Sequence, residues 1–392
     1  MIEFIKTLFK LKALTLKKAY KAYLCTLIER SIKTIVTMAI PKFPTVKQSF
    51  HTELKKRINE YFEKTGKSVE GNVQLYTKAI ILLSSFVFLY IHLVFFTPAA
   101  FWAITECVML GIVVAGIGFN IMHDGAHGSF SKYRWVNGAA AFSLNILGGS
   151  SFMWNVKHNI IHHAYTNVDG VDDDIDIQPW LRMSSTQPKL AMHRYQHIYF
   201  WFLYAMLYIF WIFILDYQKY FKKRIGIMPL KKMDVNDHLV FWGFKILHLA
   251  LFIALPIYTV GFAAWVVGFL VFSIVAGLVI SIVFQLAHTV EHTHFPMPDE
   301  VTNKLEDEWA IHQLKTTANF APKSKLINWY VGGLNFQVEH HLFPKISHIH
   351  YPEISRIIKQ TCIEFGIPYI EYPKMVQAVS SHVNFLKQMG RN

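Results

Sequence analysis

Histidine is the residue type whose spacing in this sequence could carry chemistry. Of its 20 histidines, 12 fall in four short windows, at residues 123–127, 158–163, 288–294 and 340–350. The first window reads HDGAH, and a spacing of four places two imidazoles on one helical face, where they can bind one metal ion. A single pair is more often structural, but the spacing recurs in the HNIIHH and HTVEH segments. The sequence therefore predicts a histidine-rich metal centre.

The windows offer more nitrogen donors than one metal ion needs. His162 and His163 are adjacent, so their imidazoles point in different directions and can reach different ions. In the fourth window, QVEHH, Gln337 stands in the place of a first histidine. A structural zinc ion takes four ligands, so eight or more donors imply two ions. The motifs of zinc proteases and of soluble di-iron bundles are absent, and imidazole alone leaves iron, copper and zinc open.

Cysteine chemistry and a soluble fold are both disfavoured. Cys25, Cys107 and Cys362 are too far apart for a zinc knuckle or a CxxC motif, and their odd number argues against a disulfide framework. Hydrophobic residues make up 53% of the 392-residue chain and charged residues only 17%, which is typical of an integral membrane protein. A disordered chain or a cytosolic enzyme would not have this composition.

Four apolar segments are long enough to cross about 30 Å of hydrocarbon as helices. They are residues 79–97, 99–122, 239–260 and 262–287. Short uncharged links join each pair, so we expect two transmembrane hairpins. Lysine-rich segments flank the hairpins, and the positive-inside rule places both hairpin tips away from the cytoplasm. The fold expected is an all-α membrane protein with interfacial helices and a cytoplasmic, histidine-rich helical cap.

Two further apolar segments are not expected to cross. If residues 196–215 or 137–154 spanned the membrane, histidine windows on either side of them would lie on opposite faces. Nine of the 20 residues in 196–215 are aromatic, which suits the membrane interface. We therefore expect this segment to lie in, or dip into, the cytoplasmic leaflet.

The N-terminal part of the chain is strongly basic. Residues 1–70 contain 15 Lys and Arg against six Asp and Glu, which gives a net +9 of the total +13. Because apolar segments follow, a lipid surface is a better partner than nucleic acid. We expect residues 1–76 to form a surface segment and 77–392 one domain. Residues 1–37 lack the features of a secretory signal, and a start at Met38 would make them non-native or dispensable.

The order HDxxH, HxxxHH and QxxHH, with two apolar hairpins between, resembles the membrane-bound fatty acid desaturases. The stretches HHAYTNVDGVDDDID, FQLAHTVEHTHF and NWYVGGLNFQVEHHLFP are also similar to family sequence, so that the resemblance covers residues 40–370. Gln in the third motif resembles the front-end members, in particular bacterial and cyanobacterial acyl-lipid or acyl-CoA desaturases. The resemblance implies an O2-dependent oxidoreductase that introduces a cis double bond into a fatty acyl chain, with two non-haem iron ions and two electrons per turnover.

Carried onto this sequence, the resemblance also implies roles for individual residues. The expected iron ligands are His123, His127, His158, His162, His163, His288, His340 and His341. Gln337 is expected to bind iron or hold a water, and His292 to be a further ligand or a structural residue. The residues expected to fix the ligand imidazoles are Asp124, Asn167, Asp172, Asp174 and Glu339. Trp309, Gln313 and Asn319 are expected to line the acyl channel or to serve in packing.

The substrate explains why such a site would need metal. A mid-chain methylene has no acidic proton and no leaving group, so acid–base or nucleophilic catalysis has nothing to act on. The HPGG haem motif of a fused cytochrome b5 is absent. Electrons are therefore expected from a separate ferredoxin or cytochrome b5, which would dock on the basic cytoplasmic face.

Two other functions remain open at this point. A hydroxylase acting on a lipid, sphingolipid or carotenoid would use the same scaffold and differ in retaining oxygen. A histidine-rich metal transporter would use His92, Glu106 and His248 inside the spans, but these residues are few and the clusters lie outside the spans. The sequence leaves open which bond is oxidised, the chain length, the acyl carrier and the oligomeric state.

Overall fold

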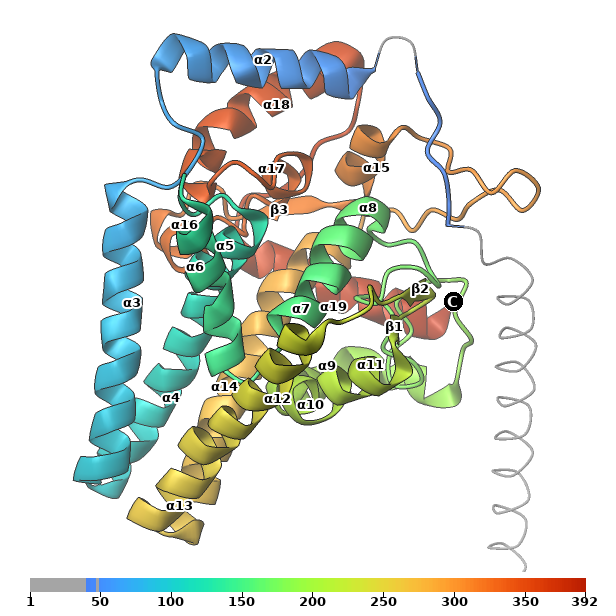
Figure 1. The fold of residues 1–392 in the computed structure, drawn as a ribbon. Coiled ribbons are helices and arrows are strands. Elements are labelled where there is room, and N and C mark those ends of the chain that lie inside the picture. The colour runs from blue at the N-terminus through green and yellow to red at the C-terminus, as the bar shows by residue number, and fades with distance from the viewer. Residues whose placement is uncertain (1–39, 47–48) are drawn as a thin grey trace, which may run out of the picture. The chain divides into compact units, whose positions relative to one another are not determined.

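The fold, seen in a computed structural model that describes residues 40–46 and 49–392, is built almost entirely from helices (Figure 1). Within these residues two small ladders occur. Strands β1 (Arg224–Ile225) and β2 (Met228–Pro229) pair antiparallel, and β3 (Ala318–Phe320) and β4 (Ile370–Tyr372) pair parallel. The expectations for residues 1–37, Met38 and Cys25 lie outside the described residues.

The chain divides into two compact units. Among its described residues, the smaller unit holds Lys42 beside Pro298–Leu305, through backbone hydrogen bonds from Lys42 to Asn303 (3.0 Å) and from Leu305 to Lys42 (2.9 Å). The larger unit comprises Phe43–Met297 and Glu306–Asn392. All helices and sites described below belong to the larger unit.

Four helical segments of the larger unit are long and apolar enough to cross a membrane, which confirms the number predicted. They are Val73–Phe96, Ala100–His127, Val235–Val260 and Phe262–His288. In Figure 1 they are α3 (Val73–Ile91) with η1 (His92–Phe96), α4 (Ala100–Ile117) with η2 (Gly118–Met122) and α5 (His123–His127), α12 (Val235–Leu249) with η6 (Ala250–Ala254) and α13 (Leu255–Val260), and α14 (Phe262–His288). The second segment runs five residues beyond the predicted end at 122, so the first histidine pair lies on its last turn.

Helix α14 packs closely against α4 and α9 (Gln196–Ala205) because glycine lies at both crossings. A Cβ atom on Gly111 of α4 would lie 2.6 Å from the carbonyl oxygen of Phe272, and one on Gly277 of α14 would lie 2.5 Å from that of Ala205. Glycine therefore lets these helix backbones approach more closely than any larger residue allows.

The segments between the second and third long helices are short and bent. Residues 137–154 are divided between α6 (Arg134–Ile146) and α7 (Ser151–Asn155), which are interrupted at Leu147–Ser150. The chain continues through η3 (Val156–His162) and α8 (His163–Tyr165). Residues 191–222 form two helical stretches, Ala191–Ala205 and Leu207–Lys222, that meet at 59°. Their elements are η4 (Ala191–Tyr195), α9, α10 (Leu207–Phe210), η5 (Trp211–Leu215) and α11 (Asp216–Lys222).

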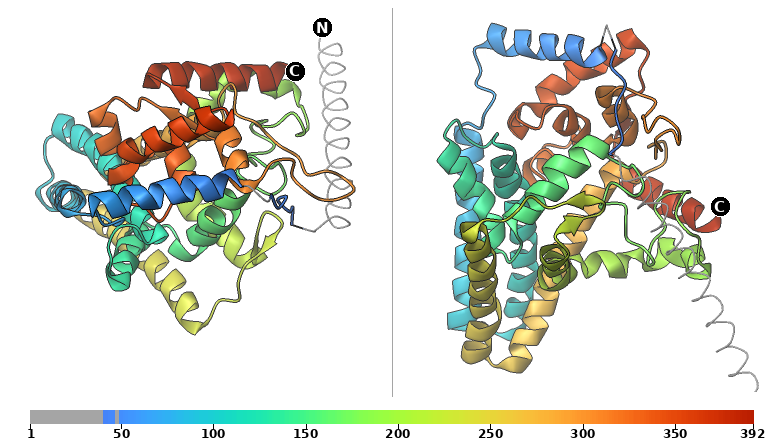
Figure 2. Two further views of the ribbon diagram at one scale, coloured as in Figure 1. Left: turned by 90° about the horizontal axis from the view of Figure 1, so that it is seen from above. Right: turned by 45° about the vertical axis from the view of Figure 1, so that its right-hand side comes forward.

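The remaining helices gather at the end of the long helices where the second and fourth finish (Figures 1 and 2). They are α2 (Phe50–Thr65), α15 (Trp309–Thr316), α16 (Lys325–Tyr330), α17 (Gln337–Leu342), η7 (His348–His350), α18 (Tyr351–Phe365) and α19 (Met375–Arg391). Helix α2 buries Leu54 and Ile58 against Ile354 and Ile358 of α18 in one apolar cluster. These helices cover the histidine motifs.

Candidate metal centre

Four segments of the chain bring eight histidines into one buried cluster. The first motif lies on α5, at the end of the second long helix, and the second motif runs through η3 into α8. His288 is the last residue of α14, and the third motif forms α17. Most of these imidazoles are fully buried, although they are far apart in sequence.

Two groups made of histidine alone could each hold a metal ion, and a third candidate set, His158, His162 and Asp174, shares one histidine with each of them. In each group one potential ligand atom per residue lies within 4.8 Å of the others. The members are His123, His127, His158 and His340 in the first group, and His162, His288 and His341 in the second. His163 lies between the groups, with its ring centroid 4.6 Å from that of His340 and 4.4 Å from that of His341. This arrangement supplies the two ligand groups that the predicted two-ion site would require.

Six of the eight imidazoles each have one buried ring nitrogen without a hydrogen-bond partner among the described residues, which is the main reason to infer a bound metal. Buried nitrogens without a hydrogen-bond partner among the described residues are Nε2 of His127, His162, His288, His340 and His341 and Nδ1 of His163. Buried polar atoms in proteins are nearly always satisfied. Metal ions bound by these nitrogens would remove the deficit, so the donor set fits a metal pair.

Burial keeps most of these imidazoles neutral, as metal ligands must be. It lowers the pKa of His158, His163, His340 and His341 well below the ordinary value, and neighbouring imidazoles lower it further. His162 differs: burial alone would lower its pKa, but the carboxylates of Asp172 and Asp174 raise it.

Carboxylates of the loop after the second motif orient His162. Its Nδ1 lies 3.0 Å from a carboxylate oxygen of Asp172 and 3.2 Å from one of Asp174, which leaves Nε2 for a metal. Asp172 also accepts a hydrogen bond from the backbone nitrogen of Asn167, and the Asn167 amide donates to the carbonyl oxygen of His288 (2.8 Å). These three residues thus hold two ligands and their loop together.

Asp124 and Glu339 were expected to fix ligand imidazoles, but their hydrogen-bond partners are other residues. Asp124 accepts hydrogen bonds from Ser347 and faces Nδ1 of His348 at 2.9 Å. Glu339 accepts from Asn319 (2.8 Å) and from the hydroxyl of Tyr369, and burial raises its pKa to about 7. Each follows or precedes a ligand by one residue, so about 100° of helix rotation turns it away from the metal groups.

Trp309 and Gln313 contact the metal cluster. Gln313 places its side-chain oxygen 2.9 Å from Nδ1 of His341, and the Trp309 indole donates to the carbonyl oxygen of His163 (3.0 Å). With Asn319, which holds Glu339, these residues support the ligands and their helix. In the described part of the chain, none of the three lines the apolar cavity beside the metal groups. Gln313 lies 28 residues before His341, so no local spacing in the sequence could have revealed their contact.

The two less closely matched candidates have different surroundings. Gln337 is 1% exposed, and its amide nitrogen has no partner among the described residues. His292 is exposed, has a positive φ of 77° and belongs to neither metal group. It follows the end of α14 at His288, where the helical spacing that would have aligned the two imidazoles no longer applies.

A narrow apolar cavity of about 40 Å³ lies beside the first metal group. Trp154 and Phe284 line it, and both rings also contact His158, with centroid distances of 4.4 Å and 6.0 Å. Met122, the residue before His123, lines it as well. The space next to the metal groups therefore accepts an apolar group and offers few polar partners to water.

Comparison with known proteins agrees with this site. The family model for fatty acid desaturases matches residues 99–373. The chain is 39% identical to the sn-1 linoleoyl-lipid 6-desaturase of Arthrospira platensis, over 88% of this chain and 93% of that protein. It is 36% identical to the Synechocystis protein of the same name, over 88% and 97%, and 34% identical to the acyl-lipid (8-3)-desaturase of Physcomitrium patens, over 88% and 72%.

Proposed function

The protein belongs to the fatty acid desaturase family and is therefore an oxidoreductase of lipid metabolism, and on this basis we propose its reaction. It introduces a cis double bond into the acyl chain of a membrane lipid, on the carboxyl side of that acyl chain. The observation that carries the proposal is the pair of buried imidazole groups beside an apolar cavity. The names of the relatives support an acyl-lipid substrate and front-end selectivity. A CoA ester remains the alternative carrier.

Two iron ions are the cofactor we propose. Bound iron would supply the O2-dependent oxidation that an unactivated methylene requires. His123, His127, His158 and His340 would hold one ion, and His162, His288 and His341 the other, with His163 between the groups. Gln337, on the same helix as His340 and His341, is a further candidate ligand. His292 is left out of this set because it is exposed and lies outside both groups.

The protein itself positions the metal ligands and the acyl chain, and it excludes water from the site. Neutral imidazoles hold the metal pair without placing fixed charge beside an apolar substrate. Asp172, Asp174 and Gln313 fix the orientation of His162 and His341. Trp154 and Phe284 hold one segment of acyl chain against the first metal group and exclude water there.

The orientation in the membrane is part of the proposal. The four long helices would form two hairpins with their tips away from the cytoplasm, and the metal centre would lie on the cytoplasmic face. Residues 191–222 would lie at the interface. Electrons would come from a separate ferredoxin or cytochrome b5 that docks on the basic cytoplasmic surface.

Expression in a host supplied with defined fatty acids tests the function. We expect new cis double bonds, located by mass spectrometry of the lipids, together with iron near two per chain in the purified protein. Chelation should abolish the activity and ferrous iron should restore it. Hydroxylated products would instead indicate a hydroxylase, and metal uptake without oxidised lipid would indicate a transporter.

A further inference from the structure

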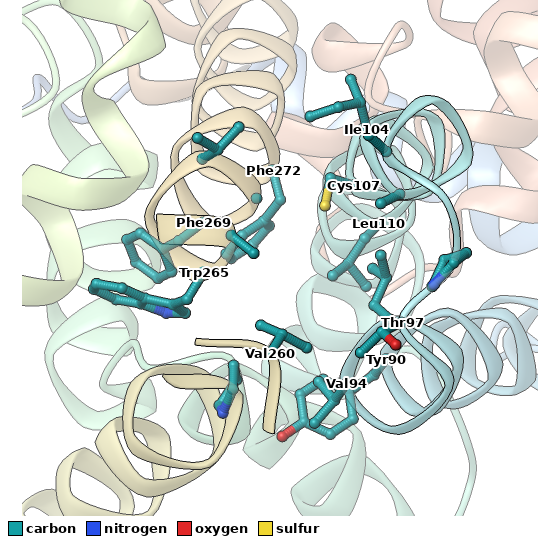
Figure 3. Close-up of a pocket in the computed structure, with 18 of the residues that line it drawn as sticks. Tyr90, Val94, Thr97, Ile104, Cys107, Leu110, Val260, Trp265, Phe269 and Phe272 are labelled. Carbon is teal, nitrogen blue, oxygen red and sulfur yellow. The ribbon is translucent and has the colours of Figure 1, made fainter. Parts of the chain in front are cut away.

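A second apolar cavity lies further along the same helices, away from the metal groups. It has a volume of about 330 Å³ and is lined almost entirely by apolar side chains of the four long helical segments. Figure 3 shows Cys107 and Leu110 of α4 facing this space from one side and Phe272 of α14 from the other. Its polar lining is limited to groups such as Thr97 and the hydroxyl of Tyr90.

Helices α4 and α14 line both cavities. On α4, Leu110 lines the second cavity and Val114 lines the cavity beside the metal, which is a separation of one helical turn, about 6 Å. On α14, Phe272 lines the second cavity and Ile280 the first, about 12 Å apart. An acyl chain that extends past the metal groups would therefore point toward the second cavity.

Two aromatic rings that contact each other line one cavity each. Tyr208 of α10 lines the cavity beside the metal, and Phe272 lines the second one. Their ring centroids are 5.2 Å apart with an interplanar angle of 71°, and both side chains are 3% exposed. The Tyr208 hydroxyl donates to the carbonyl oxygen of Leu147 (2.8 Å), and Leu147 also lines the first cavity. The ring is therefore held by packing against Phe272 as well as by this hydrogen bond.

We infer that Tyr208 and Phe272 form the end wall of the acyl cavity and set the longest chain that the enzyme accepts. The inference rests on the proposed function, because it takes the cavity beside the metal groups as the acyl site. Without the Phe272 ring, the two cavities would join, and the methyl end of a longer chain would enter the second one.

The test compares chain-length profiles of the full-length protein in membranes. Wild type and the variants Phe272→Ala and Phe272→Leu are expressed in a host fed fatty acids that differ by two carbons, and conversion of each acid is measured by mass spectrometry. We expect wild type to convert chains only up to a limit. Since one methylene in an apolar pocket changes discrimination by about tenfold or more, Phe272→Ala should raise conversion of the first excluded chain, relative to the longest accepted one, by at least about tenfold.

Two further variants separate the wall from general packing. Tyr208→Phe keeps the ring and should keep the wild-type limit. Phe86→Leu changes another aromatic residue of the same apolar cluster, which is not among those lining either cavity, and should also keep it. Phe272→Leu keeps an apolar side chain of intermediate size, so it should give a smaller shift in the same direction if the Ala variant does not accumulate.

Three results would overturn the inference. They are a wild type without a length limit, an unchanged profile in both Phe272 variants, and an equal shift in Phe86→Leu. Failure of the proposed function is distinct, because wild type would then form no double bond in any chain.

Discussion

Buried imidazole nitrogens without hydrogen-bond partners require another ligand, which we infer to be a metal ion. His341 and His288 belong to the second group, and their Nε2 atoms are both unpartnered among the described residues. His341→Ala should therefore lower the metal content and reduce desaturation by more than about 100-fold. This loss is larger than the loss expected when a residue that only orients a ligand is removed. Iron analysis of purified protein and lipid analysis of the host check this. His292→Ala is the matched control, and its loss of iron would contradict the ligand set.

A carboxylate that orients a ligand should matter nearly as much as the ligand. Asp172 is 1% exposed and lies 3.0 Å from Nδ1 of His162. Asp172→Asn removes the charge that fixes this ring, so we expect a 10- to 100-fold loss of metal affinity or activity, on the order known for such residues. Asp176→Asn changes the same loop at an exposed carboxylate that accepts from Gln178. Competition with a chelator measures the loss, and equal behaviour of the two variants would refute the role.

Spacing in the sequence predicted the residues on one helical face but not the contacts between distant segments. The pair His123 with His127 follows from helix geometry and lies in the first group, whereas His158 and His162, with the same spacing, are divided between the first and second groups. The role of Asp172 could be predicted because this residue closely follows the second motif in sequence. Asp124 could not be assigned correctly, since its partner His348 is 224 residues away. Tertiary packing decides which imidazoles share a metal group, and local spacing in the sequence cannot predict that packing.

At the scale of elements, the approach of α4 and α14 depends on one glycine. A Cβ atom on Gly111 would lie 2.6 Å from a backbone oxygen of α14 and 2.8 Å from Cβ of Val275. Gly111→Ala should force the helices apart and cost about 1–3 kcal/mol, as overpacking of a core does. Thermal unfolding in detergent measures this. Gly243→Ala on α12, where nothing lies within 4 Å, is the control and should be neutral or slightly stabilising.

Hydropathy predicted the number of long helices well and their ends less well. The predicted second span ended at residue 122, whereas the helix continues to His127 because its last turn is buried under the covering helices and need not be apolar. Residues 137–154 look like a span by composition, yet Gly148, with a positive φ of 93°, helps to end the first helix within this stretch. A hydropathy window averages over such a break and cannot detect it.

At the scale of the whole larger unit, one question is on which side of the membrane residues 191–222 begin and end. Near its start, Gln196 donates to the carbonyl oxygen of Arg182 (3.0 Å), and near its end Lys219 pairs with Asp173 at 3.1 Å. Both partners belong to the loop that follows the second histidine motif. Lys157, the residue before that motif, also contacts Asp173. These contacts favour a segment that returns to the side it left, since a crossing would separate its ends by about 30 Å.

A topology experiment tests this reading. A tag inserted after Lys223 should be inaccessible to a membrane-impermeant reagent in intact cells and should react once the cells are opened. A tag at Pro98, between the first two long helices, should react in intact cells, and this serves as the positive control. The physical reason is that Lys223 follows a segment whose ends both contact the loop beside the metal centre. Labelling at Lys223 from outside would mean that residues 191–222 cross the membrane, and the histidine motifs before and after them could then meet only if a further segment crossed back.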